Sequence, residues 1–152
     1  MTIATDGSVS YDRTCASWAC YILTPDNAVH FGGVLPVSVG YNPLVAEMMA
    51  VANALYRLEA MVADLSECDV IIYTDCLDVI TVPRRIRGAH ASKMEIVKSY
   101  QHILDKLGHY EFKWVRGHTE LQTRPHVMNR WCDRYARRLL REAVEKSRQK
   151  KG

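Results

Sequence analysis

The alternation of apolar and polar positions divides the chain into two parts. In the N-terminal part, short segments rich in β-favouring residues are separated by clusters of turn residues, which is typical of an antiparallel meander. The predicted strands cover Ile3–Ser8, Ala16–Leu23 and Ala28–Val39, and Pro36 favours an edge position for the third. We therefore expect three consecutive antiparallel strands at the start of the fold.

From Pro43 the apolar period becomes helical. Apolar residues alternate at spacings of four and three, at Leu44, Met48, Val51, Leu55, Leu58 and Val62. This spacing predicts one continuous helical face, and the fixed φ of Pro43 suits the first helical position. The later run Val70–Asp75 is wholly apolar before its final acid, as expected for a strand covered by helices on both faces.

The remaining elements continue the alternation of helices and strands. They are a brief helix that ends before Pro83, a helix from the capping-box spacing of Ser92 and Glu95 to Gly108, a strand at Tyr110–Val115, a loop at Gly117–His126 and a last helix from Val127 to about Arg148. The order βββαβαβα predicts an α/β fold with a mixed five-stranded sheet flanked by helices. At 152 residues, we expect one domain over 1–152.

Charge is unevenly distributed along the chain. Residues 134–152 hold eight Lys or Arg against two Glu, so within a net charge of +3 the first 133 residues carry −3. The last helix is therefore basic, and we expect a flexible basic tail over about 146–152. Such a face is typical either of phosphate binding or of a solvated helix end.

Cysteine usage and hydropathy exclude several classes of protein. The five cysteines form no CxxC pair and are odd in number, which favours reduced thiols over a zinc site or a disulfide framework. No apolar run approaches the roughly 18 residues of a membrane span, and the N-terminus lacks the plan of a signal peptide. We expect an intracellular protein, cytoplasmic or nuclear, with no membrane partner.

Four carboxylates occupy conspicuous positions. Asp6 lies in the first strand, Glu47 is the one charge between Pro43 and Leu55, Asp75 ends the apolar strand, and Asp133 lies in the last helix. Each also has an ordinary explanation. These are a strand-to-turn Asp-Gly pair, a carboxylate at a helix edge, a helix N-cap and a surface ion pair with Arg137.

Considered together, the four acids indicate a metal site. They can converge if the first and fourth strands are neighbours in the sheet. A carboxylate cluster repels itself at neutral pH and needs divalent cations to neutralise it. Oxygen ligands without a His or Cys cluster favour Mg²⁺ or Mn²⁺, and two such ions about 4 Å apart suit phosphoryl transfer from a phosphodiester.

The motifs around these acids resemble the ribonuclease H family, type 1, over nearly the whole chain. The matching pieces are Thr5-Asp6-Gly7-Ser8, Ala46-Glu47-Met48, Tyr73-Thr74-Asp75, Trp114-Val115-Arg116-Gly117-His118 and Asn129 with Cys132-Asp133. The resemblance implies an endonuclease that hydrolyses the RNA strand of RNA/DNA hybrids and leaves 5′-phosphate and 3′-hydroxyl ends. It also implies two metal ions per site and a monomer.

The resemblance further implies a role for each residue. Asp6 would bridge both metals, Glu47 and Asp75 would bind the metal on the leaving-group side, and Asp133 would bind the one on the nucleophile side. His118 would be the mobile loop histidine that assists proton movement or product release, and His126 competes for that role. Further candidates for nucleic-acid contact are Ser8, Arg84, Arg85, Arg87, Asn129 and Arg137.

The chain departs from the family pattern at positions that contact the hybrid in other members. Pro43, Leu44 and Leu77 stand where the family often has polar residues that read the minor groove. There is no room between Asp75 and His118 for the basic handle of many bacterial members, which makes the chain similar to retroelement-type domains. Two alternatives stay open: another nuclease of this fold, such as a junction resolvase or a double-stranded RNA cutter, and a non-catalytic nucleic-acid-binding domain.

Overall fold

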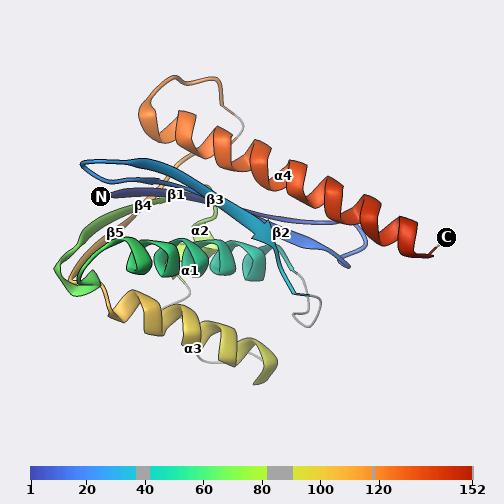
Figure 1. The fold of residues 1–152 in the computed structure, drawn as a ribbon, viewed down its shortest axis with the longest axis horizontal. Helices are drawn as coiled ribbons and strands as arrows, with labels where there is room; N and C mark the ends of the chain where they lie inside the picture. Colours follow the sequence, from blue (N-terminus) through green and yellow to red (C-terminus); the bar gives the residue numbers. More distant parts are fainter. Residues whose placement is uncertain (37–41, 82–90, 118, 152) are drawn as a thin grey trace.

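A five-stranded mixed sheet forms the centre of the fold (Figure 1). The computed structural model describes residues 1–36, 42–81, 91–117 and 119–151, with the backbone alone for 91–94 and 151. The strands are β1 (Thr2–Val9), β2 (Ala16–Leu23), β3 (Ala28–Val34), β4 (Asp69–Thr74) and β5 (His109–Trp114). They lie in the order β3-β2-β1-β4-β5, and β1 pairs antiparallel with β2 and parallel with β4. The predicted α/β sheet, with its first and fourth strands adjacent, is confirmed.

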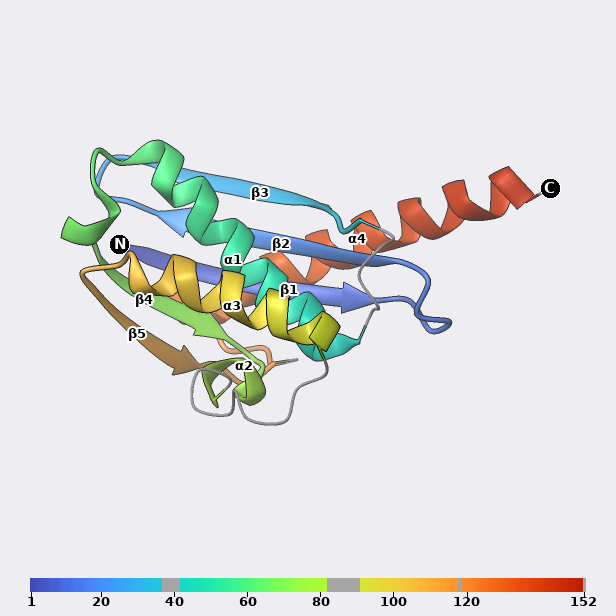
Figure 2. The same ribbon diagram turned by 90° about the horizontal axis from the view of Figure 1, so that it is seen from below.

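Helices cover both faces of this sheet (Figures 1 and 2). One face carries α1 (Pro43–Met61), against which α3 (Ala91–Asp105) packs, and the other carries α4 (Arg124–Lys151). The larger apolar cluster lies on the α1 side and a smaller one lies under α4. No helix in the described part of the chain combines the length and hydropathy needed to cross a bilayer.

Helix α1 begins where the sequence predicts. The side chain of Asn42 caps it by accepting a hydrogen bond from the Val45 N–H at 2.8 Å, and Pro43 lies in the first turn. The predicted apolar face is the buried one, because Met48, Leu55 and Leu58 pack toward the sheet. The packing of this face fixes how α1 is rotated over the sheet.

Two predicted boundaries near prolines differ from the structure. Strand β3 ends at Val34, which pairs with Ser17, because Pro36 lacks the N–H needed to continue the ladder; residues 37–39 lie outside the described residues. Helix α4 begins at Arg124 instead of Val127, and it continues to Lys151, through most of the segment expected as a flexible tail. Pro125 belongs to its first turn, where a missing N–H costs no hydrogen bond.

Two short elements complete the chain. Helix α2 (Leu77–Thr81) follows β4 and is the brief helix that the sequence predicts before Pro83. A 3₁₀ turn, η1 (Leu65–Glu67), was not predicted. It is capped by Asp64, whose side chain accepts a hydrogen bond from the Ser66 N–H at 2.9 Å.

Candidate metal centre

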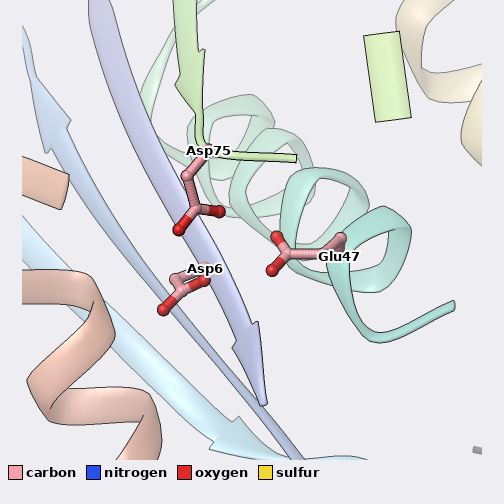
Figure 3. A group of neighbouring side chains, drawn as sticks. All are labelled: Asp6, Glu47 and Asp75. Atoms are coloured by element: carbon pink, nitrogen blue, oxygen red, sulfur yellow. The ribbon is translucent and has the colours of Figure 1, made fainter. Parts of the chain in front are cut away.

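Three of the four predicted acids meet at one end of the sheet (Figure 3). Asp6 comes from β1, Glu47 from α1, and Asp75 directly follows β4. One carboxylate oxygen from each residue lies within 4.8 Å of the other two. Asp6 and Glu47 are buried, with 4% and 8% of their surface exposed, while Asp75 is half-buried and faces them.

The register between β1 and β4 explains why the two aspartates meet. The last parallel pair of these strands joins Ala4 and Tyr73. Asp6 and Asp75 each lie two residues beyond that pair, so they share a level and a side of the sheet. A shift of one residue in this pairing would send one carboxylate to the opposite face.

Gly7 allows α1 to bring Glu47 close to the strand. A Cβ atom at Gly7 would lie 2.5 Å from the backbone carbonyl carbon of Ala46 and 2.8 Å from the backbone nitrogen of Glu47. Only a glycine fits at this distance. The Gly7 backbone N–H also donates a hydrogen bond to the Glu47 carboxylate. The glycine of the Asp-Gly pair therefore serves helix packing and carboxylate placement, in addition to any role in a turn.

Burial and mutual repulsion make the charged form of this cluster unfavourable. Burial raises the pKa of Asp6 well above its usual range, and the charges of Glu47 and Asp75 raise it further. Burial, followed by the charge of Asp75, raises the pKa of Glu47 to about 8. The cluster therefore holds protons at neutral pH unless another positive charge replaces them.

The donor atoms of this site fit a hard divalent cation. They are all carboxylate oxygens, which Mg²⁺ and Mn²⁺ prefer. One of them, Oε2 of Glu47, is buried and has no hydrogen-bond partner among the described residues. Because a buried carboxylate oxygen without a partner is costly, it is suited to accept a cation.

Asp133 faces the same region from α4. It lines a cavity of about 170 Å³ together with Asp75, Asn129 and two arginines, and its charge contributes to the raised pKa of Asp6. It also forms the ion pair with Arg137 that the sequence offers as the ordinary explanation, with 3.1 Å between Nε and Oδ1. Asp133 therefore makes the ordinary ion pair and shares a cavity with Asp75, but it does not belong to the cluster of three carboxylates.

Comparison with known proteins decides the family. An RNase H family model matches residues 1–141. The chain belongs to the ribonuclease H family. No curated protein matches this ribonuclease H chain.

Solved structures share the fold of this ribonuclease H domain. The N-terminal RNase H domain of a Mycobacterium tuberculosis protein superposes with a TM-score of 0.73 at 14% identity, covering 96% of this chain and 98% of that chain. An RNase H1 isolated from compost gives 0.73 at 16% identity, covering 94% and 96%, and another structure of that enzyme is a complex with an RNA/DNA hybrid. Prototype foamy virus protease–reverse transcriptase gives 0.71 at 18% identity, covering 91% of this chain and 20% of that one.

The other predicted site residues either belong to β1 and α4 or lie outside the described residues. His118, Arg84, Arg85 and Arg87 belong to the latter group. Ser8 is half-buried near the end of β1, and the amide oxygen of Asn129 is buried without a partner among the described residues. His126 lies in the first turn of α4, where its Nδ1 forms a hydrogen bond with the hydroxyl of Thr123.

Three residues to which the sequence assigned no role support the candidate site. Arg130 donates hydrogen bonds to the carbonyls of Thr119, at 2.9 Å, and Leu121, and so fastens the loop before α4. The Trp114 indole donates to the backbone carbonyl of Asp75 at 3.1 Å. A Cβ atom at Gly117 would lie 3.0 Å from Oδ2 of Asp75. Trp114 and Gly117 belong to a recognisable motif, whereas no local signal marks Arg130.

Proposed function

We propose that this chain is a metal-dependent endonuclease that hydrolyses the RNA strand of RNA/DNA hybrids and leaves 5′-phosphate and 3′-hydroxyl ends. The observation that carries the proposal is the cluster of Asp6, Glu47 and Asp75, three carboxylates from three elements whose oxygens lie within 4.8 Å of one another in a ribonuclease H family fold. The compost RNase H1, a structural relative, binds the hybrid that we propose as the substrate.

The acids would hold two Mg²⁺ or Mn²⁺ ions. Asp6 would contact both, Glu47 and Asp75 would hold the ion on the leaving-group side, and Asp133 the ion on the nucleophile side. When bound, the ions would lower the pKa of the attacking water and neutralise charge at the departing 3′-oxygen.

The protein itself positions the carboxylates. β1 and β4 hold the two aspartates at one level of the sheet, and the close approach at Gly7 fixes Glu47 against them. A central strand, its neighbour and a packed helix hold the three carboxylates, so these side chains have little freedom to separate. We assign His118 to proton movement or product release, and His126 is the competing residue for that role.

Leu77, at the position where the family often has a polar minor-groove residue, is 57% exposed beside Asp75. An apolar side chain cannot donate a hydrogen bond to a base edge or a 2′-hydroxyl. We therefore keep a second candidate function, another nuclease of this fold that cuts a four-way junction or double-stranded RNA. The short span between Asp75 and His118 supports a retroelement-like form without the basic handle.

A cleavage panel tests the proposal. Labelled hybrid, double-stranded RNA, double-stranded DNA and a four-way junction are each incubated with Mg²⁺ or with EDTA. We expect Mg²⁺-dependent cleavage of the RNA strand of the hybrid. Cutting of the junction or of double-stranded RNA in place of the hybrid would support the second candidate. If none of the four substrates is cleaved and calorimetry detects no divalent-cation binding, a non-catalytic nucleic-acid-binding domain would be favoured.

Matched variants locate the chemistry at the acids. Asp75→Asn should abolish cleavage because it removes one anionic ligand while keeping the side-chain shape. Asp69→Asn is the control, since Asp69 begins the same strand and its side chain is exposed. Activity that survives Asp75→Asn would refute the site. Substituting His118 and His126 separately by Ala distinguishes the two histidines, because the acting one should lower kcat without weakening hybrid binding.

We further infer that residues 1–152 fold as one RNase H-like domain and act as a monomer. The larger apolar cluster includes residues from β1, β4, α1 and α3, while α4 packs on the other face of the same sheet. A single unfolding transition and a monomer mass by light scattering are the expected results. Two separate transitions would contradict this inference.

A further inference from the structure

A groove lies beside the C-terminal half of α4, away from the three clustered acids. It has a volume of about 440 Å³ and runs between the turn that joins β1 to β2 and the helix. The turn contributes Tyr11 and Asp12, and the helix contributes Arg141, Val144 and Arg148. Figure 2 shows that this half of α4 extends past the ends of the strands.

The turn presents Tyr11 on an ordered support. The Ser10 N–H donates to the Cys15 carbonyl at 2.9 Å, and the Arg13 N–H donates to the Ser10 carbonyl at 2.9 Å. The Asp12 carboxylate accepts from the Ser10 hydroxyl at 2.8 Å. Arg13 has a φ of 60°, which a residue other than glycine rarely adopts, so these bonds hold a strained backbone. Tyr11 itself is fully exposed, at 106% of its reference surface.

The helix presents arginines along one face. Arg134, Arg141 and Arg148 are seven residues apart, which places them in one row with a rise of about 10 Å between neighbours. All three side chains are exposed, and within the described residues none of them forms an ion pair. Two acids also line the groove, Asp12 on the turn and Glu145 on the helix, so its positive charge lies along the helical wall, where two arginines outnumber one glutamate.

This row connects the groove to the acids. Arg134 lines the cavity that holds Asp75 and Asp133, and Arg141 and Arg148 line the groove farther along the helix. On the strand side, Asp6 and Ser8 point to the same face of β1, because side chains alternate along a strand. Ser17, which pairs with Ser8, donates a hydrogen bond to the Ala136 carbonyl of α4 at 2.6 Å, so this face is the one that α4 covers.

We propose that the groove binds the phosphate backbone of the nucleic-acid strand where it continues beyond the acid centre. Arg141 and Arg148 contact phosphates, and the exposed ring of Tyr11 stacks on a base. The proposal rests on the proposed function for its substrate. Val144 and Arg148 lie beyond residue 141, where the family match ends, so this half of the groove is built by a part of the chain that the family model does not cover.

Salt-dependent binding tests the arginines. Affinity for labelled hybrid and for single-stranded RNA is measured by fluorescence anisotropy in EDTA, so that no cleavage occurs. The double variant Arg141→Gln/Arg148→Gln should bind on the order of tenfold more weakly at low salt, and its plot of log K against log salt should be less steep by between 1 and 2 because each lost phosphate contact removes about 0.7–0.9 from the slope. Arg141→Lys/Arg148→Lys should keep most of the slope.

A matched control separates the groove from the overall charge of the helix. Lys146→Gln/Lys150→Gln removes the same two charges from the same half of α4, but these exposed lysines line a different cavity, on the other flank of the helix. We expect this variant to bind like the unmodified protein. Equal effects of both double variants would show that only the general charge matters and would overturn the proposal.

Tyr11 provides an independent measurement. Tyr11→Ala should weaken binding roughly tenfold at all salt concentrations without changing the slope, and Tyr11→Phe should bind normally, because stacking needs the ring and not the charge. If Tyr11→Ala instead abolished self-association measured by light scattering and left nucleic-acid affinity unchanged, the groove would be a contact between two copies of this chain and the proposal would fail.

These binding measurements distinguish this proposal from the proposed function. If binding depends on the arginines but no substrate of the panel is cleaved, the groove remains a nucleic-acid-binding site and the proposed nuclease function is refuted. Cleavage of the hybrid with an unchanged slope in the arginine variant would keep the nuclease and refute the groove.

Discussion

The protonation of Glu47 gives a quantitative prediction about stability. Its pKa is raised to about 8, first by burial and then by the charge of Asp75, whereas the same residue in the unfolded chain titrates near its ordinary value of 4.5. Between these two values the folded state holds a proton that the unfolded state has released. The free energy of unfolding of the metal-free protein should therefore fall as pH rises from about 4.5 to about 8.

The size of this loss follows from the difference between the two pKa values. At about 1.4 kcal/mol for each pKa unit, Glu47 alone accounts for a loss on the order of 5 kcal/mol above pH 8. That is a large part of the roughly 5–15 kcal/mol that stabilises a typical domain. Asp6, whose pKa is raised for the same reasons, acts in the same direction.

Glu47→Gln removes the titrating group while keeping its shape. In EDTA, we expect the variant and the unmodified protein to have similar unfolding free energies near pH 4.5, and the variant to be more stable by several kcal/mol near pH 8.5. Urea unfolding at the two pH values measures this. Glu59→Gln is the control, because Glu59 is a partly exposed acid on the same helix, paired with Lys106 at the surface.

Added Mg²⁺ should narrow this difference in stability. The unmodified protein should gain about 2.7 kcal/mol at a concentration one hundred times its dissociation constant, and more at pH 8.5 than at pH 5, because the cation replaces protons. The variant should gain much less. A Glu47→Gln variant that is less stable than the unmodified protein at pH 8.5 in EDTA, or that keeps the full pH dependence, would refute this reasoning.

Two further predictions concern residues that place the site. Gly7→Ala should destabilise the fold by about 3 kcal/mol, the upper end for overpacking, because the new methyl group would meet helix backbone at 2.5 Å; Gly33→Ala, which meets a side chain at 3.1 Å, should cost less in the same denaturant titration. Equal costs would contradict the close approach to α1. Arg130→Met should leave the loop before α4 without its hydrogen bonds, so that limited proteolysis within 119–122 becomes faster while the unfolding midpoint falls slightly. An unchanged proteolysis rate would show that the loop is held by other contacts.

The sequence by itself determined the elements and three of the clustered acids. Period-two and helical spacings encode strands and helices through short-range geometry, so the order of elements and the start of α1 could be predicted. Glu47 was recognisable because a lone charge in an apolar helix face needs a reason to be there. The end of β3 and the start of α4 were predicted wrongly near prolines, because the same residue type can end one element and begin another.

Only the tertiary structure decided how the acids are arranged. The offset of Asp6 and Asp75 from the pair Ala4 and Tyr73, the close approach at Gly7 and the cavity shared by Asp75 and Asp133 all depend on contacts between segments far apart in the chain. The same packing removes water from the acids and raises the pKa of Glu47. Local spacing fixes which carboxylates can face one another, but their distance, burial and charge state follow from how strands and helices pack, which no single segment encodes.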